Sequence, residues 1–116
     1  MSATRMLPES GLTAYFDRFT KRFLRDWHPR AVDVEVLEPE LGDQFPIVGA
    51  RLLGIVYDTD TRVLELLLDS GDHRIQQPRE VWIIEEQDGF LATMQIVHSN
   101  GIRELVSVRR VGLRRT

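Results

Sequence analysis

The chain of 116 residues contains no cysteine, and this absence excludes several kinds of site at once. Without thiolates the protein cannot form a disulfide framework, a cysteine-ligated zinc site or an iron–sulfur centre, and it has no thiol nucleophile. Cysteine-free chains are typical of a reducing compartment. We therefore expect a cytoplasmic protein, and the sequence indicates no cofactor.

Long apolar runs and the usual catalytic motifs are also missing. Residues 1–8 lack the apolar core of a signal peptide, and no stretch approaches the roughly 20 apolar residues that span a bilayer. Gly42, Gly49 and Gly54 match neither nucleotide-binding fingerprint, and no serine lies in a Gly-x-Ser-x-Gly elbow. We expect no membrane association, and the sequence favours a protein that is not an enzyme.

Charge is distributed unevenly although the net charge is only −3. Residues 1–30 carry a net charge of +3, residues 31–104 carry −10, and residues 105–116 carry +4. Oppositely charged regions can attract one another within a fold or present two different faces to partners. The pattern predicts basic ends and an acidic middle.

The spacing of large apolar side chains predicts one amphipathic helix over residues 8–27. Pro8 suits a first helical position, and Pro29 disfavours helix at the residue before it. The predicted buried stripe has spacings of three and four residues and consists of Leu12, Phe16, Phe19, Phe23 and Trp27.

Alternating apolar residues and tight-turn signals predict antiparallel strands. Asp88-Gly89 and Asn100-Gly101 favour the left-handed backbone of hairpin turns, so the C-terminal half should form a meander. We predict one α+β domain over residues 1–116, in which the helix packs on a strongly bent, five- or six-stranded antiparallel sheet that forms a half-open small barrel. The predicted strands cover residues 32–37, 48–57, 62–68, 80–86, 90–98 and 102–109, with a tail at 110–116.

A loop near the middle of the chain offers one candidate for chemistry. Asp69, Asp72 and His73 lie within five residues, and such a set could hold a divalent cation or supply a general base for a metal-dependent hydrolase. The same residues are also ordinary turn chemistry, because aspartate and serine side chains bond their own backbone.

Basic side chains offer a second candidate. The helix carries Arg18, Lys21, Arg22 and Arg25, and the end of the chain carries Arg109, Arg110, Arg114 and Arg115. If the two sets converge, the protein could contact phosphates as a nucleic-acid-binding small barrel. Pairs four residues apart, such as Asp17 with Lys21, favour instead a solvated helix face.

Several short motifs occur in an order that resembles a small bacterial family of uncharacterised proteins, domain of unknown function 5335. They are Leu7-Pro8, Phe16-Asp17-Arg18-Phe19, Val34-Glu35-Val36-Leu37, Leu41-Gly42-Asp43-Gln44, Leu53-Gly54-Ile55-Val56-Tyr57-Asp58, Asp72-His73-Arg74-Ile75, Pro78-Arg79-Glu80 and Asn100-Gly101. The resemblance covers nearly the whole chain and implies a free-standing domain with a histidine at position 73. It carries no established activity, and the arginine-rich ending is not part of the family pattern.

Together these observations favour a non-catalytic protein-interaction or regulatory module with an unknown protein partner. The nucleic-acid-binding barrel and the metal-dependent hydrolase are the alternatives. We expect a monomer, or a homodimer that pairs through an edge strand. The candidate contacts for a partner or ligand are Asp72, His73, Arg79, Arg18, Arg22, Arg25, Arg109 and Arg110.

Overall fold

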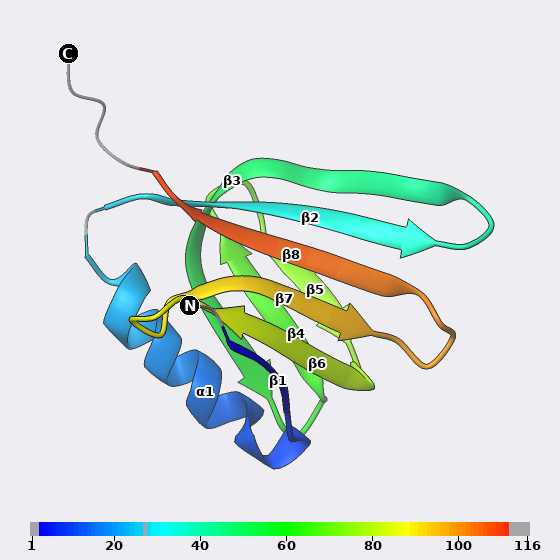
Figure 1. Ribbon diagram of the computed structural model, residues 1–116, viewed down its shortest axis with the longest axis horizontal. Coiled ribbons are helices and arrows are strands. Elements are labelled where there is room, and N and C mark those ends of the chain that lie inside the picture. The colour runs from blue at the N-terminus through cyan, green and yellow to red at the C-terminus, as the bar shows by residue number, and fades with distance from the viewer. Residues whose placement is uncertain (1–2, 27, 112–116) are drawn as a thin grey trace.

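A computed structural model describes residues 3–26 and 28–111, which form one helical segment and one curled antiparallel sheet (Figure 1). The sheet has eight strands in the order β1-β6-β7-β8-β2-β3-β4-β5. The strands are β1 (Ala3–Leu7), β2 (Arg30–Glu38), β3 (Gly42–Asp58), β4 (Val63–Leu68), β5 (His73–Gln76), β6 (Glu80–Glu85), β7 (Leu91–Val97) and β8 (Arg103–Arg110). The predicted α+β class and the half-open barrel are confirmed.

The predicted number of strands was wrong, because β1 and β5 were missed. Strand β1 precedes the helix and pairs with β6, whereas no element was predicted for this segment. Strand β5 has four residues, of which only Ile75 is buried, and it was missed between the predicted strands at 62–68 and 80–86. A strand this short shows too few alternations to reveal its period.

The helical segment is shorter than predicted. It begins with a 3-10 turn (η1, Glu9–Gly11), continues as α1 (Leu12–Phe19) and ends in a π-helical turn (η2, Thr20–Leu24). The predicted stripe is buried at its first three positions and partly buried at Phe23, and Trp27 lies outside the described residues. Among the described residues, the structure contains no helix that could span a bilayer.

Strand β3 holds the helix in place because it changes partners along its length. Residues 42–51 pair with β2, whereas residues 52–58 pair with β4, so the backbone of Ile55 has a side that no strand occupies. The Thr20 hydroxyl takes that place: it accepts from the Ile55 N–H at 3.0 Å and donates to its C=O at 3.2 Å. Gly54 packs closely beside this contact, because a Cβ there would lie 3.5 Å from the Thr20 methyl and 3.3 Å from a Leu67 methyl.

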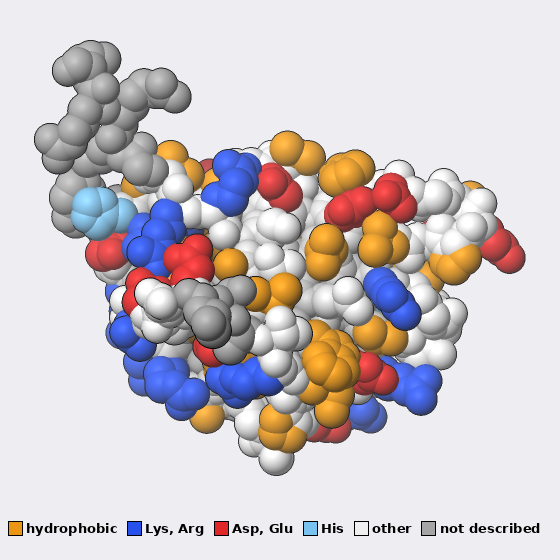
Figure 2. Space-filling view, viewed as in Figure 1, with side chains coloured by type: hydrophobic (Ala, Val, Ile, Leu, Met, Phe, Trp, Pro, Cys, Tyr) orange, Lys and Arg blue, Asp and Glu red, His pale blue; other side chains and the backbone are white. Residues whose placement is uncertain are grey.

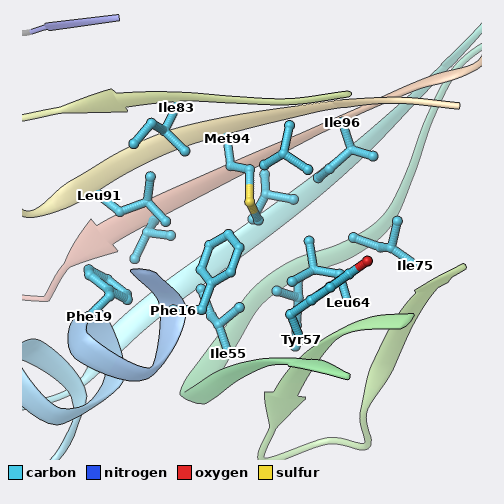
Figure 3. Close-up of a cluster of buried hydrophobic side chains, with 14 of the residues drawn as sticks. Phe16, Phe19, Ile55, Tyr57, Leu64, Ile75, Ile83, Leu91, Met94 and Ile96 are labelled. Atoms are coloured by element: carbon cyan, nitrogen blue, oxygen red, sulfur yellow. The ribbon is translucent and has the colours of Figure 1, made fainter. Parts of the chain in front are cut away.

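The hydrophobic core lies inside the curl of the sheet. Phe16 projects from α1 into its centre, between Met94 of β7 and Ile55 of β3 (Figure 3). All three side chains are fully buried, and each such burial contributes about 1.5–3 kcal/mol. Phe19 lies at one end of this core, and Ile96 lies near the other (Figure 3). The two ends carry the two polar clusters described below.

Candidate functional site

A pocket of about 250 Å³ lies between the helix and the β6–β7 turn. We call it the arginine pocket, and its lining is Arg5, Tyr15, Arg18, Phe19, Arg22, Phe23, Glu85 and Gly89. Most of these lining residues come from the helical segment, where residues three and four apart lie on the same face. Arg18 and Arg22 therefore project together, and β1 supplies Arg5 from the opposite side.

Each arginine of the pocket lies over an aromatic ring. The guanidinium carbons of Arg5 and Arg18 are 5.4 and 5.9 Å from the centre of the Tyr15 ring. The guanidinium carbon of Arg22 is 4.8 Å from the centre of the Phe23 ring. Cation–π contacts of this kind contribute about 0.5–1 kcal/mol at exposed sites. The rings thus hold the arginine side chains in place.

Glu85 is the one acidic residue in the pocket lining, and both of its carboxylate oxygens have partners within the pocket. The Tyr15 hydroxyl donates to Glu85 Oε2 at 2.6 Å, and Arg5 Nη2 lies 3.4 Å from Oε1. Burial, and then the hydrogen bond to this carboxylate, raise the pKa of the Tyr15 phenol well above its ordinary value. Tyr15 therefore stays protonated at neutral pH and acts as a donor.

Arg18 and Arg22 are the available cations of the pocket. Within residues 3–26 and 28–111, neither guanidinium has a carboxylate at ion-pair distance. Gly89, in the turn opposite, has φ +89°, and a Cβ there would lie 3.3 Å from Arg22 Nη1. The turn glycine thus gives the Arg22 side chain room beside the pocket.

The predicted convergence of the helix with the end of the chain is present in part. Arg110 lies 5.9 Å from the Phe23 ring that Arg22 also covers, and 4.2 Å from the Phe90 ring. Arg110 is paired, however, with Asp88 at 2.5 Å. Hydrogen bonds from Arg110 and from the Phe90 N–H lower the pKa of Asp88.

The remaining predicted arginines lie apart from this pocket. Arg109 points to the other face of β8 and pairs with Asp33 at 3.1 Å. Arg25 and Arg79 are exposed and line no part of the pocket. Arg114 and Arg115 fall outside the described residues. Arg5 and Glu85 were not predicted as site residues, because the sequence pattern does not reveal that β1 pairs with β6.

A second polar cluster joins His73 to residues far away in the sequence. Its Nε2 atom lies 2.8 Å from Glu104 Oε1, and His98 Nε2 lies 2.6 Å from Glu104 Oε2. Only 9% of the Glu104 side chain is exposed. Burial by itself would raise the pKa of Glu104, but the hydrogen bonds from the two imidazoles outweigh it and hold the pKa below its ordinary value. Glu104 is therefore an ionised, nearly buried carboxylate.

The predicted loop site at 69–73 does not assemble around a common centre. Asp69 Oδ1 accepts from the Arg51 N–H at 3.0 Å, and Asp72 Oδ1 accepts from the Leu68 N–H at 3.4 Å. In the part of the chain that the structure describes, no three His, Asp or Glu side chains are arranged to hold a metal ion. His73 instead bonds Glu104, which a separation of 31 residues hides from sequence analysis.

Comparisons with known proteins place the chain in a family. The model of a family of unknown function, DUF5335, matches residues 3–112. An uncharacterized protein of Aquifex aeolicus (strain VF5) is 32% identical over 109 residues, which cover 92% of this chain and 93% of the relative. No solved structure matches. The resemblance seen in the sequence is thus confirmed, and the chain belongs to the DUF5335 family of unknown function.

Proposed function

We propose that the protein is a non-catalytic interaction module that binds an acidic segment of a partner protein in the arginine pocket. The observation that carries the proposal is the pair Arg18 and Arg22, which lie at one pocket without a carboxylate partner among the described residues. Planar guanidinium groups bind carboxylates with two parallel hydrogen bonds. An acidic ligand would provide the anions that the pocket itself lacks.

The positive charge of the pocket and the restricted arginine side chains support an acidic ligand. Three arginines face one glutamate, and that glutamate already accepts a hydrogen bond from Tyr15. Because each guanidinium rests on an aromatic ring, less side-chain freedom remains to be lost on binding. The lining contains no serine, histidine or lysine, and Tyr15 is held protonated. These features favour recognition over catalysis.

A protein ligand is favoured over a nucleic acid by the position of the aromatic rings. Proteins that bind single strands stack bases on exposed aromatic faces. Here Tyr15 and Phe19 are buried, and arginines cover the rings of Tyr15 and Phe23. Within the arginine pocket, bases would find no free ring on which to stack.

The proposal is tested with a short fluorescein-labelled peptide of alternating glutamate and phenylalanine residues. Anisotropy is measured at low ionic strength, because salt screens exposed charges. We expect the wild-type protein to bind this peptide and not a lysine–phenylalanine counterpart. The double substitution Arg18→Gln and Arg22→Gln should weaken binding at least about tenfold.

The matched control changes the same amount of charge on the same helical segment. Lys21 and Arg25 are exposed and line no part of the pocket, so Lys21→Gln with Arg25→Gln should weaken binding less than about twofold. Equal losses in both variants would indicate general charge attraction and contradict the proposal. Preferential binding of a deoxythymidine oligonucleotide, lost steeply on adding salt, would favour the nucleic-acid alternative.

A further inference from the structure

The hairpin that joins β2 to β3 exposes large apolar side chains at one end of the molecule. We call residues 38–48 the projecting hairpin. Leu41 is 69% exposed, Phe45 is 59% exposed and Val48 is 71% exposed. A cluster of exposed apolar side chains on a small soluble protein commonly marks a contact with another protein. The hairpin thus resembles a docking element more than a simple turn.

The charge of the projecting hairpin is entirely negative. It carries Glu38, Glu40 and Asp43 and no basic residue. Asp43 also lies against Glu35 of β2, and the hydrogen bond between these two carboxyl groups raises the pKa of Glu35. Crowded like charges of this kind are relieved by a cationic surface. The hairpin therefore fits a partner that is basic and partly apolar.

The arginine pocket of the same protein has this complementary chemistry. Its lining combines three arginines with Phe19 and Phe23. The molecule measures 46 Å along its longest axis, and the hairpin and α1 lie toward opposite ends of that axis (Figure 1). Basic side chains gather over the helix at the lower left, whereas acidic and apolar side chains occupy the hairpin at the right (Figure 2). A hairpin therefore cannot reach the pocket of its own chain.

We infer that the arginine pocket binds the projecting hairpin of a second copy of this chain. Phe45 would enter the apolar part of the pocket, and Asp43 would face Arg18 and Arg22. The inference rests on the proposed function, since it names the acidic segment that the pocket binds. Because the two contacting surfaces differ, a single contact leaves one pocket and one hairpin free. These bind further copies head to tail or, where two copies lie antiparallel, bind each other and close a two-fold dimer.

The exposed edge of the hairpin argues against strand pairing as the mode of contact. Over residues 42–51, β3 has a strand neighbour only on the β2 side. Pro46 in this segment has no N–H to donate, and the pairing with β2 is interrupted by register shifts between Val32 and Val36. Proline and irregular backbone are the devices that protect sheet edges from edge-to-edge pairing. Side-chain docking into a pocket is thus the better supported contact.

Sedimentation equilibrium of the full chain tests the inference. Between about 10 µM and about 1 mM, the mean mass of the wild type should rise above the 13.4 kDa of one chain and reach at least twice that value. The pocket variant Arg18→Ser with Arg22→Ser should stay monomeric. The hairpin variant Asp43→Asn with Phe45→Ser should also stay monomeric, and Leu41→Ser gives a second, milder hairpin variant.

Mixing the two variants gives the decisive result. Each pair contains one intact pocket and one intact hairpin, so an equimolar mixture should reach twice the mass of one chain and go no higher. Circular dichroism checks that each variant is folded. A monomeric wild type, or a wild-type dimer that persists in both variants, would overturn the inference. If the wild type is monomeric while the glutamate–phenylalanine peptide still binds the pocket, this inference fails and the proposed function stands.

Discussion

Replacing Glu104 tests whether the His73–Glu104–His98 cluster stabilises the fold. Strand β5 carries His73, Glu104 lies on β8, and the cluster therefore joins an edge strand to the middle of the sheet. A hydrogen bond to a charged group contributes about 1.5–3 kcal/mol, and Glu104 accepts two. The His73 and His98 side chains are 22% and 20% exposed, so when Glu104 is removed, water can replace part of the lost hydrogen bonding.

These values predict that Glu104→Ala lowers the free energy of unfolding by about 2–4 kcal/mol. In a domain of this size, that change lowers the melting temperature by about 8–16 °C. Glu104→Gln retains one carbonyl acceptor and presents an amide N–H₂ to the second imidazole. We therefore expect it to cost about half as much. Urea unfolding at pH 6.5 and calorimetry provide the two measurements.

The pH dependence gives a second, independent check on Glu104. Its pKa in the folded protein is lower than the ordinary 4.5, so the ionised form stabilises the fold. This contribution is fully present above about pH 4.5 and is lost as the pH falls through the folded pKa. The difference in stability between wild type and Glu104→Gln should therefore shrink between pH 5 and about pH 3. An unchanged difference over this range, or a melting temperature within about 2 °C of wild type for Glu104→Ala, would refute the reasoning.

Two further predictions concern the hydrogen bonds of Thr20 and the pKa of Tyr15. Thr20→Val removes both hydrogen bonds to Ile55 and should lower the free energy of unfolding, measured in urea, by about 2–3 kcal/mol. Thr13→Val removes one hydrogen bond, to the Tyr57 C=O, and should lower it by about 1 kcal/mol. Equal effects of the two substitutions would contradict the role of Thr20 in holding the helix against β3. Because the pKa of Tyr15 is raised, this phenol should stay protonated on titration to about pH 11, and wild type and Tyr15→Phe should develop the same phenolate absorbance. A larger absorbance in the wild type would show that the Tyr15 phenol ionises at its ordinary pKa.

Features set by neighbouring residues could be predicted from the sequence. The helical stripe at Leu12, Phe16 and Phe19 is buried, as its spacing indicates. The two turn glycines have the positive φ that the hairpin motifs predict, +89° at Gly89 and +88° at Gly101. In each case the information lies within one turn of helix or one hairpin. The physical cause is steric and local, so no distant residue is needed to express it.

The candidate site was predicted only on its helical side. Arg18 and Arg22 are neighbours because of helical geometry, which their spacing already implies. Their environment depends on Arg5 and Glu85, which come from β1 and β6. Strand β1 was not predicted, and its pairing with β6 joins residues about 80 positions apart. Such a contact leaves no periodic signal in either segment.

The sequence by itself determined the α+β class, the amphipathic helix, the tight turns of the meander and the approximate positions of six strands. Strand β3, however, begins at Gly42 and not at residue 48 as predicted. Tertiary structure alone decided that β3 changes partners beside Thr20, that Glu104 receives both histidines, and that Arg5 faces the helix. The periodicity of apolar residues indicates which face of a helix or strand is buried, because the hydrophobic effect depends on each side chain and not on its partner. It does not encode which dry or charged surfaces meet, because that depends on how the whole sheet curls around its core.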